Sequence, residues 1–285
     1  MRRPSRCMKG LKRSVIRLDS VSFRYRADAP LALDGVSLTL EAGELVAVVG
    51  ANGSGKSTLA RLCDGLLRPS AGHVTVDGLD TRDDETLWDV RTLVGMVFQD
   101  PDDQIVGTLV EEDCAFGPEN IGVPSVEIRQ RVDAALVAVG LDGLERHEPH
   151  LLSEGQKQRL AVAGALAMRP RYLVFDEPTA MLDPAGRRAV LAIAGRLARV
   201  EGHGVLVISH DAAGVAHADR VIGLAAGRVV FDGEPEGLLG DRELLERVGL
   251  SLPPAARLAA ALRQRGLSVP AAAADAESVV AALWR

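Results

Sequence analysis

Apolar and polar residues alternate at the start of the chain in the way that is typical of half-buried strands. Between Val15 and Val49 there are three such runs, VIRLDSVSFRY, GVSLTL and GELVAVV, joined by turns that contain Gly and Asp. A helix-like segment, TLARLCDGLL, follows Ser57, and two more strand-like runs come after it, HVTVDG and LVGMVFQ. The first part of the chain is therefore predicted to be mainly sheet.

The pattern becomes mostly helical from about residue 104 to residue 168, with expected breaks at Pro118, Pro124 and Pro149. The segments that follow are a short apolar strand, YLVFDE, an amphipathic helix, GRRAVLAIAGRLARV, and a second apolar strand, GVLVISH. Strands that alternate with helices are typical of a parallel α/β sheet. The chain is thus predicted to form an α/β domain over residues 15–238 that contains a helical subdomain at about 104–168.

Both ends of the chain differ from this domain in composition. Residues 1–14 contain six Lys and Arg, which predicts a solvated basic tail, with contact to anionic lipid or RNA as the alternative. After residue 238 the sequence becomes rich in Ala, and the segment PPAARLAAALRQRG begins on Pro and stops at Gly266, as a capped helix does. Residues 239–285 are predicted to be a small helical appendage.

Composition excludes several classes of protein. The chain has 285 residues, of which 47% are hydrophobic, so it can bury a sizeable core. The formal net charge is −6, whereas a protein that binds nucleic acid needs a basic surface, so a nucleic-acid partner is not expected. No uncharged apolar stretch reaches the roughly 18 residues of a membrane span, so any membrane role is expected to be peripheral. The three cysteines lie far apart, which favours a reducing cytoplasm.

The strongest motif is GANGSGKST at residues 50–58, a full GxxxxGK[ST] match between a strand and a helix. Glycines in such a loop let successive backbone N–H groups face phosphates, while the lysine supplies a charge to the outer phosphates and the serine offers its hydroxyl to Mg²⁺. The alternative is a glycine-rich turn without a ligand, in which the lysine is only solvated. The predicted nucleotide-binding residues are Gly50, Asn52, Gly53, Ser54, Gly55, Lys56, Ser57 and Thr58.

Two adjacent carboxylates, Asp176 and Glu177, end the apolar strand YLVFDE. Neighbouring residues on a strand point to opposite sides, so the two acids are expected to have different roles. Asp176 is placed to hold Mg²⁺ through water, and Glu177 to polarise the water that attacks as the γ-phosphoryl group leaves. A pair of solvated acids at a strand end is the alternative. Together with the phosphate loop, the pair predicts nucleotide hydrolysis.

The segment LLSEGQKQRLAVAG, residues 151–164, has a polar loop followed by a run of helix formers. Ser153, Gly155 and Gln156 lie where the helix is expected to begin, and a helix start with open N–H groups is suited to an anion. Glu154 carries the same sign of charge as that anion. It is therefore expected to point away from it, into water or along the first helical turn.

The phosphate loop, the two carboxylates and the segment LLSEGQKQRLAVAG, together with the order of the motifs along the chain, resemble those of the ATP-binding-cassette (ABC) ATPases. The resemblance covers about residues 15–238. The resemblance implies that Gln99 in VFQD is the Q-loop glutamine, which serves both the reaction and the Mg²⁺ ion. It implies that His210 in VISHD is the switch histidine and that Tyr25 stacks on adenine. LSEGQ resembles the family signature, and Asp183 in MLDP resembles the dimer-contacting residue of the D-loop.

The same resemblance implies a composite site shared by two subunits. The signature loop of one subunit caps the γ-phosphate of the ATP that is bound by the phosphate loop of the other. The chain is therefore expected to bind ATP and Mg²⁺ and to dimerise with a second ATPase subunit, identical or different, when ATP binds. The implied fold is an ABC cassette with a mixed sheet, an antiparallel β subdomain and a helical subdomain. Glu154 departs from the commoner double glycine of the signature, and Ala180 departs from a commoner serine.

A narrower resemblance covers nearly the whole chain. The segment from QDPDDQ to GVP, the signature helix and the tail VGLSLPPAARLAAALRQRGL are similar to the ATPase subunits of energy-coupling-factor importers, which include cobalt, nickel and vitamin importers. This resemblance implies a peripheral position on the cytoplasmic side of the plasma or inner membrane. It also implies a membrane coupling protein and a substrate-binding membrane subunit as partners.

By this narrower resemblance, Gln104 lies near the groove for the coupling protein, and the C-terminal helices help to hold the ATPase dimer together. Two alternatives stay open at this point. One is an ATPase of an ordinary importer, and the other is a soluble ABC ATPase of translation or DNA repair. The second alternative is less favoured, because translation ATPases of this family usually carry two cassettes in one chain and repair ATPases have long coiled coils between the phosphate loop and the signature. This chain has one phosphate loop and only about 100 residues between that loop and the signature.

Overall fold

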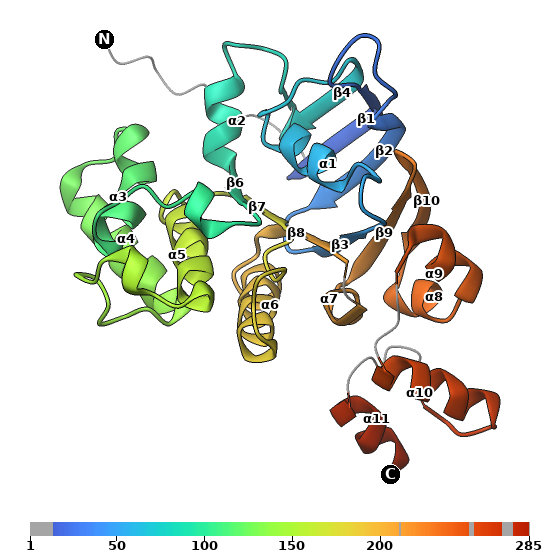
Figure 1. Ribbon diagram of the computed structural model, residues 1–285. Helices are drawn as coiled ribbons and strands as arrows, with labels where there is room; N and C mark the ends of the chain where they lie inside the picture. Colours follow the sequence, from blue (N-terminus) through green and yellow to red (C-terminus); the bar gives the residue numbers. More distant parts are fainter. Residues whose placement is uncertain (1–13, 211, 251–253, 270–275, 285) are drawn as a thin grey trace.

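A computed structural model describes residues 14–210, 212–250, 254–269 and 276–284 (Figure 1). Two sheets form its centre, with helices around them. The basic tail predicted over residues 1–14 lies outside the described residues, apart from Ser14.

Within the described residues, the main sheet has six strands. In spatial order they are β10 (Arg228–Gly233), β9 (Arg220–Ala225), β3 (Leu45–Val49), β8 (Gly204–Ser209), β7 (Tyr172–Asp176) and β6 (Val94–Val97). The pairs from β9 to β6 are parallel, whereas β10 pairs antiparallel with β9 at one edge. The sheet is therefore mixed, as the family resemblance implied, and a purely parallel sheet is the wrong reading. Strands β3, β7 and β8 are buried along their whole length, which explains their continuous apolar sequence.

The second sheet is antiparallel and is formed mostly by the N-terminal part of the chain. Its order is β2 (Leu33–Glu41), β1 (Val15–Phe23), β4 (Ala71–Val76) and β5 (Leu79–Asp80). On β2 buried and more exposed positions alternate over much of the strand, which is why its sequence pattern has a period of two. The mixed sheet with helical parts and this antiparallel sheet are the parts that the family resemblance predicted.

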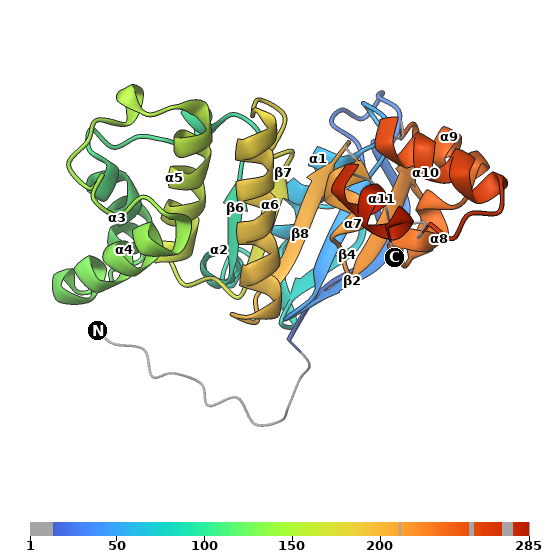
Figure 2. The ribbon, with the colours of Figure 1, turned by 90° about the horizontal axis from the view of Figure 1, so that it is seen from below.

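Helices cover the main sheet on two sides, as Figures 1 and 2 show. Their bounds are α1 (Lys56–Cys63), α2 (Leu87–Leu93), α3 (Val110–Asn120), α4 (Ser125–Val139), α5 (Glu154–Ala167), α6 (Pro184–Arg199) and α7 (Ala212–Ala216). On β3, Ala47 and Val49 join a core cluster with residues of α3 to α6. Val46 and Val48, which point to the opposite face, join a cluster with α1 and the antiparallel sheet. The strand period thus divides the core into two layers.

The helical subdomain differs from expectation at one proline. Pro118 lies inside α3, and that helix continues to Asn120. A proline in the last turn removes one N–H bond and needs only local adjustment, so it does not break the helix there. Pro124 directly precedes α4, and Pro149 begins a short 3₁₀ helix, so both of these mark boundaries as expected.

The C-terminal segment consists of two separately packed parts. Helices α8 (Pro235–Leu239) and α9 (Arg242–Val248) pack on the main core, which contains Leu239, Leu245, Val248 and Leu250. Helices α10 (Pro254–Gln264) and α11 (Ala276–Leu283) instead pack on each other around a small cluster of their own. The packing therefore moves the start of the appendage from residue 239 to a point after Leu250.

We expect truncation to separate these two parts. A chain that ends at Leu250 should keep the melting temperature of the main domain within a few degrees. A chain that ends at Leu238 loses the buried side chains Leu245 and Val248, and deletions of that size cost about 2–5 kcal/mol each. It should melt at least about 10 °C lower or fail to fold. Equal melting temperatures for the two truncations, measured by circular dichroism, would contradict this boundary.

Asp64, at the end of α1, is a buried carboxyl that should make stability depend on pH. Burial raises its pKa from 3.8 to about 7, although Leu66 N donates a hydrogen bond to it. The folded protein therefore keeps a proton that the unfolded chain has released, and the free energy of unfolding falls as pH rises from about 4 to about 7. Asp64→Asn keeps an acceptor for Leu66 N and should raise the melting temperature more at pH 8 than at pH 4. A gain that is equal at both pH values would rule out this explanation.

Candidate functional site

The phosphate loop lies between β3 and α1, and two of its glycines are required by the backbone. A Cβ atom on Gly50 would lie 2.4 Å from the carbonyl oxygen of Leu224 and equally close to Ser54 Oγ. Gly55 directly precedes α1 with a φ of 104°, in the left-handed region that favours glycine. Gly53 has a positive φ as well. The loop therefore has the tight curvature that the motif predicted.

Lys56 is the first residue of α1 and is almost fully buried. Its Nζ donates to the carbonyl oxygens of Gly50, at 2.9 Å, and Ala51, at 3.2 Å. The same nitrogen lies 3.6 Å from Glu177 Oε1. The loop's own backbone thus holds the ammonium group in place, and the charge faces the strand end that carries the two acids.

Ser57 and Asp176 meet beside the phosphate loop. Ser57 Oγ donates a 2.9 Å hydrogen bond to Asp176 Oδ1, and Asp176 is 4% exposed. Burial raises the pKa of Asp176, while the Ser57 hydrogen bond opposes that shift. A buried carboxylate with an oxygen neighbour is a suitable environment for a hard cation such as Mg²⁺, whose charge would favour the ionised form.

Gln99 lies on the same side of the molecule as this pair. A cavity of about 570 Å³ is lined by Ser57, Asp176 and Gln99 together with Arg61, Asp100 and Asp103. All three residues predicted to serve Mg²⁺ therefore line one cavity, although they come from three distant parts of the sequence.

The backbone conformation of Glu177 gives its side chain different surroundings from those of Asp176. Its φ of 51° lies in the left-handed region, which is uncommon for a residue other than glycine. The strand has ended at this point, so a left-handed turn, and not strand alternation, distinguishes the surroundings of the two acids. Glu177 Oε2 lies 3.3 Å from His210 Nδ1, and its other oxygen faces Lys56. The structure thus brings Glu177 and His210 together at the edge of the phosphate loop.

Ser54 and Tyr25 complete the phosphate-loop side. Ser54 Oγ is buried and, among the described residues, has no hydrogen-bond partner. A buried hydroxyl without a partner costs about 1–3 kcal/mol, so an anion in the loop would supply what it lacks. Tyr25 is 57% exposed, and its hydroxyl lies 2.9 Å from Thr58 Oγ1. The loop therefore fits a polyphosphate, with an aromatic face beside it.

The signature loop forms the start of α5. Ser153 is the residue that caps the helix: Gln156 N donates to Ser153 Oγ at 3.3 Å, and Ser153 N donates to Gln156 Oε1 at 2.9 Å. This reciprocal pair holds the loop in one conformation. Ser153, Glu154 and Gly155 line a cavity of about 510 Å³ with Asp183 of the D-loop. Glu154 was expected to point away from the anion; it lines this cavity, and its carboxylate is paired with Lys157 in the first turn of α5.

The two halves of the predicted site lie apart within one chain. The phosphate-loop serine, Ser57, lines one cavity, and Ser153 lines another, and of their lining residues only Met181 is shared. Residues of the two predicted groups therefore do not converge on a single cavity in the monomer. This arrangement agrees with the expectation that a second subunit supplies the signature loop.

Two functional neighbours of these motifs were missed by the sequence analysis. Lys157 pairs with Glu154, with 3.1 Å between Lys157 Nζ and Glu154 Oε1, and the spacing of three residues on a helix was the available signal. Gln158 is 1% exposed and donates from Nε2 to the Phe98 carbonyl oxygen at 3.2 Å. Gln158 lies among the polar residues at the start of α5, so the sequence pattern did not indicate that it would be buried.

Gln104 holds the strand that leads to Gln99. Its Oε1 accepts from Phe98 N, and its Nε2 donates to Met96 O, each over 3.1 Å. Together with Gln158, it fixes the backbone on both sides of Phe98. The amide of Gln104 therefore positions the Q-loop, while Val106 and Gly107, which follow it, line a separate cavity.

Comparisons with known proteins agree with this site. The family model for the ABC transporter matches residues 33–180, and the chain belongs to this family of ATP-binding subunits. It is 53% identical to the energy-coupling factor transporter ATP-binding protein EcfA1 of Symbiobacterium thermophilum, over 93% of this chain and 95% of the relative.

Two solved structures extend the comparison. The structure of cbiO1 from Clostridium perfringens, described as part of the ABC transporter complex cbiONQ, superposes with a TM-score of 0.76 at 34% identity, over 89% of this chain and 100% of the other. The dimeric structure of MJ0796, a bacterial ABC transporter cassette, superposes with a TM-score of 0.70 at 30% identity, over 77% of this chain and 98% of the other.

These findings confirm the predicted class and activity. The chain is an ATP-hydrolysing subunit of the energy-coupling-factor type of ABC transporter, and its relatives bear the names of such subunits. In the part of the chain that the structure describes, no helix combines the length and apolar composition needed to cross a membrane.

Proposed function

We propose that this subunit energises import of a micronutrient, a metal ion or a vitamin, by ATP-driven closure of a dimer on a membrane coupling protein. The placement of Glu177 between Lys56 and His210, next to the Ser57–Asp176 pair, supports the ATP-driven step, and the similarity to energy-coupling factor subunits supports the role in transport. The arrangement around Glu177 combines phosphate binding, cation binding and a base in one place. A peripheral position on the cytoplasmic side of the plasma or inner membrane follows from this role.

Each residue of the phosphate-loop side then has a role in hydrolysis. The backbone of residues 50–55 and the Lys56 ammonium bind the phosphates, and the Tyr25 ring faces the adenine. Ser57, Asp176 and Gln99 would hold Mg²⁺, which supplies positive charge to the phosphate oxygens. Glu177 accepts a hydrogen bond from the attacking water and draws its proton away, while His210 keeps the Glu177 carboxylate oriented.

The second subunit supplies the other half of the site. Ser153 presents its hydroxyl and Gly155 its backbone N–H to the γ-phosphate bound by the partner, while Gln156 holds Ser153 in place through the capping pair. Asp183 lines the same cavity as Ser153 and Gly155. Two sites per dimer result, each built from the phosphate loop of one subunit and the signature loop of the other. ATP is then needed at the interface, so binding favours the dimer and hydrolysis favours its opening.

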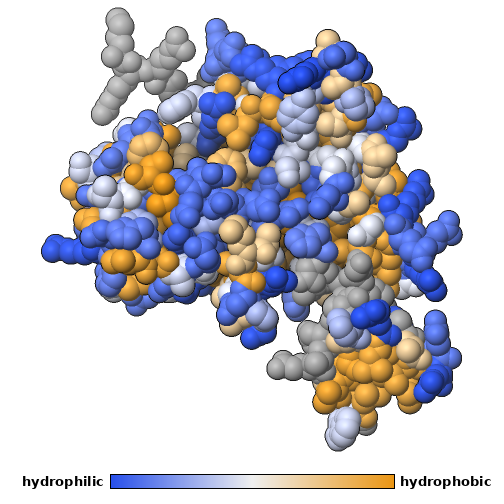
Figure 3. Space-filling model, viewed as in Figure 1, coloured by the Kyte–Doolittle hydropathy of each residue, from blue (hydrophilic) through white to orange (hydrophobic). Residues whose placement is uncertain are grey.

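The C-terminal helices offer a further dimer contact. Apolar side chains gather on the α10–α11 pair (Figure 3). The exposed ones are Leu258, Leu267, Val280, Leu283 and Trp284, the last at 83%. A face of this kind is expected to be covered by a partner surface. We assign it to the second ATPase subunit, as the family resemblance implied for these helices.

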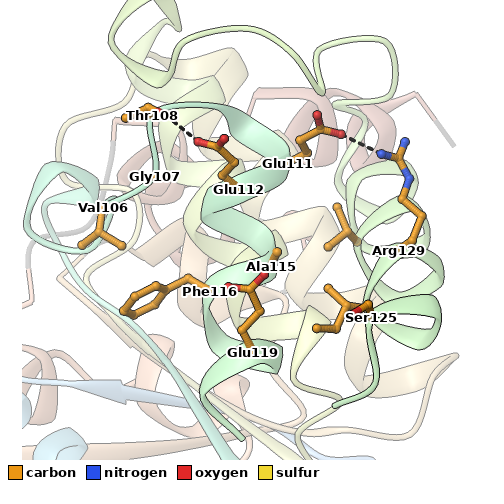
Figure 4. Close-up of a pocket in the computed structure, with 12 residues that line it drawn as sticks. Val106, Gly107, Thr108, Glu111, Glu112, Ala115, Phe116, Glu119, Ser125 and Arg129 are labelled. Carbon is orange, nitrogen blue, oxygen red and sulfur yellow. Dashed lines mark hydrogen bonds and ion pairs between the residues drawn. The ribbon is translucent and has the colours of Figure 1, made fainter. Parts of the chain in front are cut away.

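The membrane coupling protein is proposed to dock on the helical subdomain. A cavity of about 670 Å³ lies between α3, α4 and the segment at residues 106–108 (Figure 4). Val106 and Phe116 are largely exposed there, and three glutamates, Glu111, Glu112 and Glu119, outnumber the one arginine, Arg129. An apolar floor with an acidic rim fits an amphipathic helix that carries basic residues.

Reconstitution tests this proposal. The full chain is combined in proteoliposomes with a membrane coupling protein and a substrate-binding membrane subunit, and uptake of a labelled micronutrient is measured with and without ATP. Phe116→Asp places a charge in the groove and should abolish co-purification and uptake. Val137→Asp is the matched control, because Val137 is also exposed, at 64%, and does not line the cavity. Uptake that survives Phe116→Asp, or that needs no ATP, would contradict the proposal.

A further inference from the structure

Lys157 lies one turn inside α5 and connects the signature loop to the segment after Gln99. Its Nζ is 3.1 Å from Glu154 Oε1 and 3.0 Å from Asp102 Oδ1. The Lys157 side chain is only 12% exposed, whereas those of Asp102 and Glu154 are 61% and 45% exposed. One partly buried lysine therefore binds two carboxylates that come from different segments of the chain.

Asp102 belongs to a hydrogen-bonded turn and contacts the lysine from outside α5. It lies in the 3₁₀ helix Pro101–Asp103, and its backbone N–H donates to Asp100 Oδ1 at 2.9 Å. The adjacent residue on α5, Gln158, is bound to Phe98 O on the other side of Gln99. The ammonium group of Lys157 is thus held at a fixed place beside the signature loop.

The position of the Lys157 ammonium group matters because Glu154 brings a negative charge to the signature loop. Glu154 is the first residue of α5, where free N–H groups and the helix dipole create a positive potential. A carboxylate there stabilises the helix, but it also lowers the potential that is available to a phosphate. Lys157 offsets part of this charge: it is the one base within residues 153–157, but it is shared with Asp102, so the cluster of Glu154, Lys157 and Asp102 keeps a formal charge of −1.

We propose that Lys157 is a positioning residue for ATP hydrolysis: it holds the Glu154 carboxylate and offsets its charge, so that the signature loop can receive the γ-phosphate of the partner subunit's ATP. The proposal rests on the composite site described under the proposed function. It explains how this chain combines a glutamate in the signature with an ATPase site. The glutamate and the lysine then act as a pair, and the lysine matters only while the glutamate is present.

A double-mutant cycle tests this dependence. Lys157→Gln, Glu154→Gln and the double variant are made in the full chain, and Mg²⁺-ATP hydrolysis is measured at about 20 mM and about 300 mM salt. At low salt Lys157→Gln should lower kcat/KM about tenfold, and at high salt about threefold or less, because screening weakens the uncompensated charge of Glu154. Glu154→Gln alone, and the double variant, should stay within about threefold of the unaltered protein.

Two matched variants separate this effect from folding and from total charge. Lys157→Arg keeps the charge and should stay within about threefold of the unaltered rate. Arg242→Gln removes one positive charge from an exposed i,i+4 pair on α9 and should change nothing. Melting temperatures of all variants show which of them are folded.

The proposal is overturned if Lys157→Gln leaves the rate unchanged, or if the double variant loses as much activity as Lys157→Gln alone at both salt concentrations. The second result would mean that the lysine acts through Asp102 alone. Light scattering on the unaltered protein with ATP is run in parallel. A chain that neither dimerises nor hydrolyses ATP refutes the proposed function, and this inference with it. An active dimer without rescue by Glu154→Gln refutes this inference only.

Discussion

Glu177→Gln is expected to stop ATP hydrolysis while ATP still binds. The amide keeps the size and shape of the side chain but cannot draw a proton from the attacking water, and general-base contributions of this kind are about 10²- to 10⁴-fold. ATP that is bound and not hydrolysed should then hold two subunits together. The rate is measured by phosphate release, and the dimer by light scattering at saturating ATP and Mg²⁺.

The matched control for this variant is Glu246→Gln. Glu246 is a surface residue of α9 in an ion pair with Arg242, so the same chemical change there should leave the rate within about twofold. A Glu177→Gln protein that remains monomeric with ATP would exclude the dimer mechanism. One that hydrolyses ATP at the unaltered rate would exclude Glu177 as the base.

Lys56→Ala should weaken ATP binding at least about tenfold, or about 1.4 kcal/mol, because it removes the charge that the loop directs at the outer phosphates. The loop itself should survive, since Gly50 and Gly55 determine its curvature. Without Lys56, Glu177 also loses its neighbouring cation at 3.6 Å. Calorimetry with ATP measures the affinity, and Arg242→Ala is the control. An unchanged affinity would contradict the assignment of the phosphate loop.

Motifs with a local cause were predictable from the sequence. The phosphate loop depends on glycines at fixed spacing, and the fully apolar run at Leu45–Val49 could only be a buried strand or a buried helix segment. Ser153 and Gln156 could be recognised as a helix start because the capping pair is only three residues apart.

Features that depend on tertiary contacts were not predictable in this way. The antiparallel edge strand β10 and the attachment of α9 to the core depend on which surface each one covers, and a sequence pattern does not contain that information. The left-handed backbone at Glu177 has no local signal either, because neither glycine nor asparagine is present there. The contact between Lys157 and Asp102 joins residues 55 positions apart, so only the fold brings them together.

The separation of Ser57 and Ser153 into different cavities has a consequence for mixed assemblies. In a homodimer, a chain with a damaged phosphate loop still carries a sound signature loop, and a chain with a damaged signature loop still carries a sound phosphate loop. When the two inactive proteins are mixed, one site of their heterodimer combines the intact phosphate loop of one chain with the intact signature loop of the other. The second site contains both damaged loops. Complementation between Lys56→Ala and Ser153→Ala chains would therefore recover activity that neither chain has alone, with at most half of the sites competent in each such pair.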